Sequence, residues 1–425
     1  MPPSQTTPPT PPSRNTPRTP PSRNTPPTPP SRTTPRAKTA PTLFTRPLAA
    51  VLLCTWSGFA GFYLLLPTVP EYAAEAGGQR AAGLVTGLLM SATVAVQPVV
   101  PRLLARIGYR AALVVAMALL GGPVPVLVLT GDPVVVAICS LLRGAGFGVF
   151  VVAGSAAVAE LSPEDRRSRG AGWYGVATGL GGAIGLPFGV LLTHEFGYRV
   201  MFVAGAVAPA CGLLAALGVI APRPRRVRRT RVLTGLRQPA LLRPFVLLTA
   251  GTMAAGTVMT FLPPAAPREP VWLSPAALLV FQLALTGSRW LSGRLGDRFG
   301  NRMLLPPAAL ITAIGALGGT VTGHLPALLV LMLVFGLGFG ALQNATLVLM
   351  LHRAGRPGFA VAGAQWNLAF DAGLALSGFC VGTVVQYAGY PAGFVAAAAV
   401  LLLAVFVALG DVRAGGRDGG GDGRA

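Results

Sequence analysis

The chain has 425 residues, of which 52% are hydrophobic and only 11% are charged. Soluble domains carry roughly 25% charged residues, so this composition excludes a single water-soluble core. A formal net charge of +21 would indicate nucleic-acid binding in a soluble chain, but the arginines come without interleaved aromatic residues and without a recognisable binding module. We therefore expect a membrane protein with no nucleic-acid partner.

The N-terminal segment is a proline-rich repeat with a period of nine residues, in which residues 2–36 read PPSQTTPPT, PPSRNTPRT, PPSRNTPPT and PPSRTTPR. Proline at this density favours extended polyproline II, which buries little surface. We predict that residues 1–46 form a disordered cytoplasmic tail and that the glycine-rich residues 411–425 form a second, flexible one. A ligand for a proline-binding domain is the alternative to a plain low-complexity expansion.

Twelve apolar stretches follow the proline-rich tail. A helix of about 20 residues crosses the roughly 30 Å hydrocarbon core of a bilayer. We predict spans at 48–70, 81–100, 110–130, 134–157, 168–192, 198–220, 243–263, 273–292, 303–322, 325–350, 359–383 and 390–410.

Basic residues fix the predicted orientation of these spans. With both ends cytoplasmic, the inner gaps and the tails hold all but five of the 34 Lys and Arg residues, the exceptions being Arg80, Arg143, Arg199, Arg268 and Arg289. Cytoplasmic loops carry such an excess of basic residues, and a basic linker attracts anionic lipid. We therefore predict a multi-pass protein of the cell membrane with both termini in the cytoplasm.

An internal repeat divides the apolar region into halves. Residues 101–110 (PRLLARIGYR) match residues 293–302 (GRLGDRFGNR) at an offset of 192, and the same offset aligns residues 141–149 with residues 333–341. Two segments that share one offset indicate a tandem duplication related by an axis along the membrane normal. We predict an all-α protein with six-helix bundles at 47–220 and 243–410, joined by an arginine-rich linker at 221–242.

The second copy of the repeat resembles the G-x-L-x-D-R-x-G-R-R loop motif of the major facilitator superfamily, with Gly293, Asp297, Arg298, Gly300 and Arg302 at the matching positions. The resemblance covers about 48–410 and implies a secondary transporter with two six-helix bundles. It also implies a gating loop, in which Gly293 and Gly300 form a tight turn and the two arginines lie at the lipid headgroups.

The acid of this motif has an expected partner. Asp297 would face the positive N-terminus of the fifth span near Ser168, and this contact would break as the bundles rock. A plain basic turn is the alternative. The first copy departs from the motif, since Pro101 replaces the first glycine and Ala105 replaces the aspartate.

The fifth span resembles the glycine-proline motif of the twelve-helix drug/proton antiporter branch, through Gly181, Gly185 and Pro187. Glycines four residues apart permit close helix packing, and proline removes a backbone hydrogen bond. The motif therefore implies a kinked helix at the interface between the bundles. Generic small-residue packing explains the same pattern.

Polar residues inside the spans are the candidates for proton coupling and substrate binding. Arg143 in the fourth span is costly in a membrane unless it is solvated or paired, so we expect it to face a cavity or to form an ion pair. Asp371 is the acid placed deepest in a span, and a carboxyl that alternates between apolar and cationic surroundings loads and releases a proton. A static pair between Asp371 and Arg289 is the alternative. Four amides accompany Asp371 in the tenth and eleventh spans, namely Gln343, Asn344, Gln365 and Asn367.

The predicted function is proton-coupled efflux of small organic molecules by alternating access. An uptake permease of the same fold is the first alternative, and a non-transporting membrane sensor is a remote one. An enzyme is not expected, because the chain lacks a phosphate-binding loop, an H-E-x-x-H motif and paired intramembrane carboxylates. We expect no cofactor and no metal, since the histidines (His194, His324 and His352) and the cysteines (Cys54, Cys139, Cys211 and Cys380) are scattered. The expected partners are a small-molecule substrate, protons and the lipid bilayer, and we expect a monomer.

Overall fold

The computed structural model describes residues 45–163, 166–221, 239–266 and 270–418. These residues belong to one compact unit, Thr42–Ala425. The predicted N-terminal tail and most of the predicted linker fall outside the described residues, so their boundaries remain predictions. The predicted flexible tail at 411–425 begins too early, because residues 411–418 continue the last helix, and the rest of that tail falls outside the described residues.

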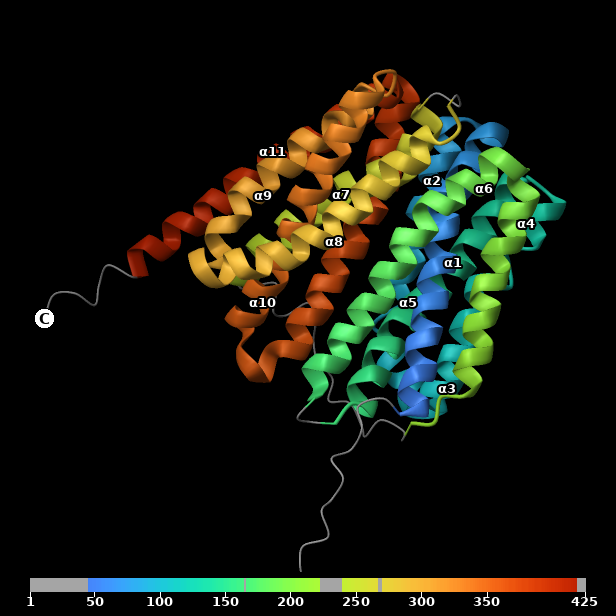
Figure 1. Ribbon diagram of the computed structural model, residues 1–425, viewed down its shortest axis with the longest axis horizontal. Coiled ribbons are helices and arrows are strands. Elements are labelled where there is room, and N and C mark those ends of the chain that lie inside the picture. The colour runs from blue at the N-terminus through green and yellow to red at the C-terminus, as the bar shows by residue number, and fades with distance from the viewer. Residues whose placement is uncertain (1–44, 164–165, 222–238, 267–269, 419–425) are drawn as a thin grey trace, which may run out of the picture. The chain divides into compact units, whose positions relative to one another are not determined.

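Every regular element in the described part is helical (Figure 1). The first half contains α1 (Arg46–Gly77), α2 (Gln79–Val96), α3 (Val100–Gly121), the short α4 (Val126–Leu129), α5 (Pro133–Leu161) and α6 (Arg167–Leu217). The second half contains α7 (Pro239–Ala265), α8 (Leu273–Phe299), α9 (Asn301–Ala316), the 3-10 helix η3 (Leu317–Thr320), α10 (Leu325–Leu376), the π-helical η4 (Ser377–Val381) and α11 (Gly382–Asp418).

Two of these helices, α6 and α10, are each two spans joined at a glycine, and α11 begins with the last residues of the eleventh span. α6 and α10 have 51 and 52 residues, more than twice the length that crosses a bilayer. Their backbones leave the helical region at Gly197 (φ 79°) and Gly355 (φ 64°), and α11 does so at Gly389 (φ 81°). Counted with these breaks, the described helices follow the twelve predicted spans in order. The prediction of an all-α membrane protein is confirmed.

By length and composition, nine helical stretches of the described chain are apolar enough to cross a membrane. Two of them, Arg169–Leu217 and Val361–Phe406, each contain one of the glycine breaks. α8 is long enough but is not among the nine. It carries Gln282, Arg289 and a basic last turn, and these polar residues lower its mean hydropathy.

The left-handed glycines confirm the internal duplication. Gly108 (φ 80°) and Gly300 (φ 83°) are related by the offset of 192 seen in the sequence, and so are Gly197 (φ 79°) and Gly389 (φ 81°). Glycine alone adopts a positive φ without a steric penalty, so each pair marks the same turn in the two halves. The fold is therefore two pseudo-symmetric bundles.

Close backbone contacts join the two bundles. Gly83 of α2 packs on Gly378 and Gly382, and Gly87 packs on the ring of Phe379. A second contact runs between α6 and α8, where Gly182 faces the side-chain amide of Gln282. These two helix pairs form the sides of the space between the bundles.

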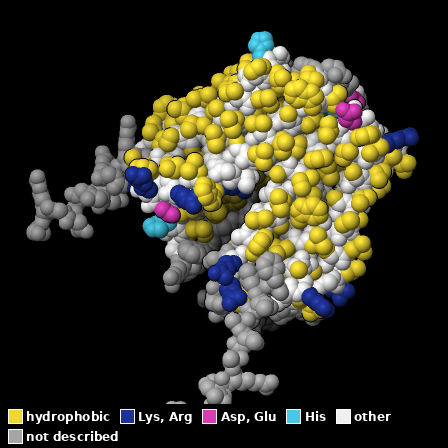
Figure 2. Space-filling model, viewed as in Figure 1, with side chains coloured by type: hydrophobic (Ala, Val, Ile, Leu, Met, Phe, Trp, Pro, Cys, Tyr) yellow, Lys and Arg dark blue, Asp and Glu magenta, His cyan; other side chains and the backbone are white. Residues whose placement is uncertain are grey.

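The outer surface suits lipid. Large apolar side chains such as Leu129, Ile220 and Phe406 are at least 70% exposed. Figure 2 shows one face of the molecule covered by hydrophobic side chains, with Lys and Arg near its margins. The same view shows a hollow between the two groups of helices, which opens toward the end at which α1 begins in Figure 1.

Candidate functional site

A cavity of about 190 Å³ lies between the two bundles, and we call it the central cavity. Its lining comes from α1, α5 and α6 of the first bundle and from α7, α8 and α10 of the second. Aromatic residues form much of it: Phe59, Phe62, Tyr63, Phe147, Tyr174, Phe339, Trp366 and Phe370. The polar lining consists of Thr178, Gln282, Thr286, Arg289, Gln343, Asn367 and Asp371, together with the tyrosine hydroxyls.

Helical periodicity places these polar residues on one face of each helix. On α8, Gln282, Thr286 and Arg289 are spaced by four and three residues. On α10, Asn367 and Asp371 are four residues apart. Residues at these spacings lie above one another on the same face, so each helix presents a polar stripe to the cavity.

The wall from the first bundle is mainly aromatic. Phe62 and Phe147 stack with ring centroids 3.7 Å apart, and Phe59 meets the edge of Phe147 at 5.6 Å. Phe59, Phe62 and Tyr63 of α1 all line the cavity, whereas Trp56 of the same helix is 37% exposed and does not. The helix-1 aromatics therefore serve both as packing and as cavity wall.

Asp371 is bonded to the opposite bundle. Its side chain is 4% exposed, and its Oδ2 accepts a hydrogen bond from Gln97 Nε2 at 2.5 Å. Gln97 caps the C-terminal end of α2, so this bond crosses between the bundles. Asp371 is the only acid among the described residues that line the central cavity. The static pair with Arg289, which was the alternative, is not present among the described contacts.

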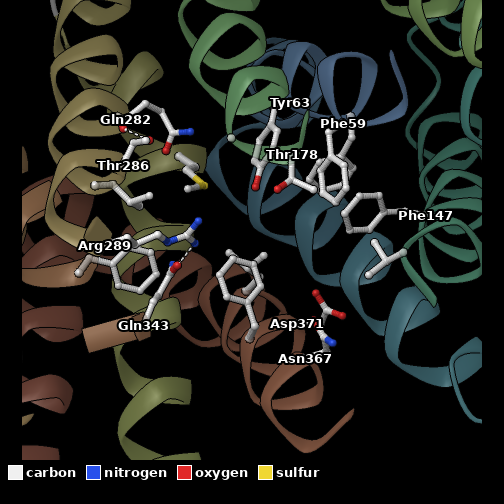
Figure 3. A pocket seen from close by; sticks show the side chains of 18 of the residues that line it. Phe59, Tyr63, Phe147, Thr178, Gln282, Thr286, Arg289, Gln343, Asn367 and Asp371 are labelled. Carbon is white, nitrogen blue, oxygen red and sulfur yellow. Dashed lines mark hydrogen bonds between the residues drawn. The ribbon is translucent and has the colours of Figure 1, made fainter. Parts of the chain in front are cut away.

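Arg289 has a neutral partner instead of an acid. Its guanidinium donates a hydrogen bond to Gln343 Oε1 (Figure 3). Tyr63 lines the same cavity as Arg289 and Asp371, so the tyrosine hydroxyl and the two charges belong to one site. Figure 3 shows Arg289 and Asp371 on separate helices.

The duplication relates these charged positions. Gln97 and Arg289 are separated by the same offset of 192 residues, and so are Gly179 and Asp371. The Gln97–Asp371 pair, which joins α2 to α10, is therefore equivalent by the duplication to the pair of Arg289 on α8 and Gly179 on α6. Because Gly179 has no side chain, Arg289 lacks the corresponding partner. The two equivalent interfaces thus differ in charge.

Arg143 lies outside the central cavity. It is fully buried in α5, and its three guanidinium nitrogens have no hydrogen-bond partner in the described part of the chain. The expectation that Arg143 faces the cavity is not met, and the alternative ion pair is not found among the described residues either. A buried unpaired charge costs several kcal/mol, so this residue stores unfavourable energy in this conformation.

The four predicted amides divide into two groups. Gln343 and Asn367 line the cavity, and Asn367 Nδ2 also donates to the Gly363 carbonyl at 3.1 Å. Gln365 is fully buried and Asn344 is partly buried, and neither lines the cavity. The amide Nδ2 of Asn344 is enclosed and has no hydrogen-bond partner among the residues that the structure describes.

The predicted gating loop is only partly as expected. Gly300 makes the turn between α8 and α9 with φ 83°, but Gly293 lies within α8 and contributes no turn, so that expectation was wrong. Asp297 is exposed, and its expected contact with the N-terminus of α6 near Ser168 stays a prediction.

The arginines of the loop differ in their surroundings. Arg298 is exposed, with its guanidinium 5.2 Å from the centroid of the Phe299 ring. Arg302 is partly buried, and its Nε has no hydrogen-bond partner in the described part of the protein. The exposed Arg298 therefore fits the expected position at the lipid headgroups better than the partly buried Arg302 does.

The glycines of the fifth span pack within their own bundle. A Cβ on Gly181 would lie 2.7 Å from the Phe59 Cβ, and one on Gly185 would lie 2.8 Å from the Ala60 carbonyl oxygen, both on α1. Close packing is therefore observed within the first bundle, while the helix itself lies at the interface between the bundles, where Gly182 faces Gln282 of α8. Pro187 lies inside α6, whose only departure from helical backbone angles is at Gly197 rather than at the proline.

One acid near the far end of α1 is enclosed. Glu71 is 4% exposed and bonds to His194 Nε2 at 3.1 Å. Among the described residues, no group of three or more His, Cys, Asp or Glu side chains is arranged to hold a metal ion. Cys54 and Cys139 are buried thiols, whereas Cys211 and Cys380 are exposed ones.

Sequence reasoning missed several cavity residues. The spacing of Gln282, Thr286 and Arg289 in an otherwise apolar helix was a signal that could have identified the polar stripe of α8. Gln97 gave no such signal, because it is a single amide beside Pro98 and its partner lies 274 residues away.

The family model of the major facilitator superfamily matches residues 51–365. The chain belongs to the major facilitator superfamily. It is therefore a membrane transporter of small molecules and not an enzyme, as predicted. The central cavity lies between the two bundles, where substrates of such transporters bind.

Two curated relatives match the transporter. The chloramphenicol resistance protein of Streptomyces lividans is 28% identical over 363 residues, covering 80% of this chain and 88% of that protein. An uncharacterised MFS-type transporter, YtbD of Bacillus subtilis (strain 168), is 26% identical over 261 residues, covering 57% of this chain and 63% of that protein.

Solved structures agree in fold. A bacterial homologue of the human lysosomal transporter Spinster, in an inward-facing and occupied conformation, superimposes with a TM-score of 0.70 at 13% identity, covering 86% of this chain and 96% of that one. A peptide transporter, POT, in complex with sulfate gives 0.70 at 16% identity, covering 88% and 95%. At these identities the likeness shows the fold alone.

Proposed function

We propose that this transporter exports small organic molecules from the cytoplasm in exchange for protons, by alternating access in the cell membrane. Asp371 carries the proposal. It is the acid of the central cavity, and its hydrogen bond to Gln97 joins the two bundles. A carboxyl that bonds across the moving interface experiences different surroundings when the bundles rock, and such a change loads and releases a proton.

The distribution of arginines supports the orientation. With α1 beginning in the cytoplasm, the inner gaps hold most of the basic residues. The hollow in Figure 2 then opens to the cytoplasm, and the Gly83 contacts with Gly378 and Gly382 close the outer side. This arrangement corresponds to an inward-open state, from which an exporter loads its substrate.

Export of drug-like compounds is supported by the relative from Streptomyces lividans, whose name is chloramphenicol resistance protein. The aromatic wall of the cavity suits such compounds, because aromatic side chains offer large apolar faces. Uptake of a small metabolite by the same fold is the competing function, and the direction of movement distinguishes the two.

The test follows chloramphenicol in cells with and without this protein, first with the pH gradient present and then with the gradient collapsed. We expect lower accumulation in cells with the protein, and we expect the difference to disappear when the gradient is collapsed. Asp371→Asn removes the titrating group and should abolish gradient-driven export. Glu195→Gln, which changes an exposed acid outside the cavity, should leave export unchanged.

Two outcomes would contradict the proposal. Full gradient-driven export by the folded Asp371→Asn variant would exclude Asp371 as the proton carrier. Gradient-driven accumulation of the compound, in place of its loss, would favour the uptake permease.

A further inference from the structure

The central cavity holds one positive and one negative side chain that do not neutralise each other directly. Arg289 donates to Gln343, and Asp371 accepts from Gln97. Each charge is thus held by one neutral amide. An arginine has five N–H donors and a carboxylate has about four acceptor positions, so both groups retain capacity for a ligand.

Arg289 and Asp371 offer a substrate two binding groups of opposite hydrogen-bonding character. Arg289 comes from α8 and supplies only donors, so it suits a hydrogen-bond acceptor of the substrate. Ionised Asp371 comes from α10 and supplies only acceptors, so it suits a donor. Figure 3 shows the two side chains on different helices, with the hydroxyl of Tyr63 directed between them.

The charge of the cavity selects against ions. Among the described lining residues, Arg289 and Asp371 are the charged ones, and their charges cancel while Asp371 is ionised. A substrate with a net charge would leave one of these two side chains without a balancing charge, which is costly for a group as buried as Asp371, whose side chain is 4% exposed. An uncharged substrate leaves the charges of Arg289 and Asp371 balanced by each other.

The size and walls of the cavity limit the rest of the molecule. The volume of about 190 Å³ is below the roughly 300–1,000 Å³ of sites for drug-sized ligands. Phe59 and Phe147 line one side, and Phe370 lines the other. Aromatic rings pack well against such walls by offset stacking or edge-to-face contact.

We propose that the central cavity selects uncharged molecules of one aromatic ring that carry a hydrogen-bond acceptor at one end, bound by Arg289, and a hydrogen-bond donor at the other, bound by Asp371. This inference rests on the proposed function, because it describes the substrate of the same site. It goes beyond that function by naming two recognition points and the chemistry of each.

The experiment measures equilibrium binding to the purified full-length transporter with matched ring compounds. Para-acetylbenzyl alcohol carries both groups. Para-isopropylbenzyl alcohol lacks the acceptor, and para-methylacetophenone lacks the donor. Because hydrogen bonds to charged groups are the stronger kind, we expect the first compound to bind about tenfold more tightly than either of the others. Para-acetylbenzylamine, a cation at neutral pH, and para-(hydroxymethyl)benzoate, an anion, should bind at least about fivefold more weakly than the first compound.

Variants assign each recognition point. Arg289→Met should reduce the affinity of para-acetylbenzyl alcohol to that of para-isopropylbenzyl alcohol, and it should change the affinity of the latter less than twofold. Asp371→Leu should remove the advantage of the hydroxyl in the same way. Arg289→Lys should restore part of the loss, and Arg199→Met, which removes an exposed charge outside the cavity, should change nothing. Thermal unfolding shows whether each variant is folded.

Three results would overturn the inference: equal affinity for all three uncharged compounds, equal weakening of all compounds by Arg289→Met, or tightest binding of the cation or the anion. Each of them leaves proton-driven export untouched, because the binding assay needs no gradient. Conversely, selective binding without gradient-driven transport would contradict the proposed function and would leave the specificity standing.

Discussion

The contact between Gly83 and the opposite bundle offers a sharp test of the inward-open assignment. An ideal Cβ on Gly83 would lie 2.9 Å from the Gly382 Cα and 3.4 Å from the Gly378 carbonyl carbon, and it would also meet the Gly378 carbonyl oxygen. These neighbours are backbone atoms, which cannot swing away as a flexible side chain does. Gly83→Ala should therefore force the outer ends of the two bundles apart.

The magnitude follows from the cost of overpacking. Inserting a methyl group into a tight contact costs about 1–3 kcal/mol. If that cost applies only while the outer side is closed, the ratio of outward-open to inward-open molecules rises by a factor of about 5–150. Gly363→Ala is the matched control in α10, because no heavy atom lies within 4 Å of its Cβ position.

The assay follows labelling of the cavity from outside intact cells. Thr178→Cys places a thiol in the central cavity, in a background whose four native cysteines are replaced by alanine. A membrane-impermeant maleimide should label this thiol faster in the Gly83→Ala variant than in the parent, and Gly363→Ala should have no effect. Unchanged external labelling of folded Gly83→Ala protein would refute the reasoning, because the contact would then play no part in closing the outer side.

Three further predictions concern single residues. Arg143→Met should raise the temperature of thermal unfolding, since it removes a buried guanidinium that has no hydrogen-bond partner among the described residues, whereas Arg199→Gln should not; an unfolding temperature below that of the parent would show that Arg143 has a stabilising partner. Gly300→Ala should destabilise the protein by about 1–2 kcal/mol, because an L-residue with a side chain is strained at φ 83°, and denaturant unfolding measures the loss. The free energy of unfolding of Gly185→Ala should be lower than that of Gly175→Ala by about 1–3 kcal/mol. Both variants gain the same helix propensity, but only the alanine at position 185 meets the backbone of α1. Equal free energies of unfolding would contradict this packing.

The local pattern of the sequence was enough for much of the fold. Apolar length predicted the spans, and the repeated segment at 293–302 predicted two equivalent halves. The left-handed glycines Gly108 and Gly300 lie within that repeat at equivalent places, so the duplication extends to the backbone. These features depend on residues near one another in the chain, where helix length and turn chemistry act directly.

The candidate site was only partly predictable. Asp371, Gln343 and Asn367 were identified because polar side chains inside apolar spans are costly and therefore informative. Arg143 gave the same signal, yet it is enclosed outside the cavity. Polarity within a span indicates a constraint, but it does not show the direction in which the side chain points.

The sequence by itself predicted the apolar spans, the basic gaps between them and their doubling, because each is a property of short stretches of chain. Only the tertiary structure decided that Gln97 bonds to Asp371, that Arg289 bonds to Gln343, and that Gly185 faces α1 instead of the other bundle. These contacts join helices that are far apart in the chain. Their partners depend on how each helix is rotated and packed against its neighbours, and periodicity within one helix leaves that rotation open.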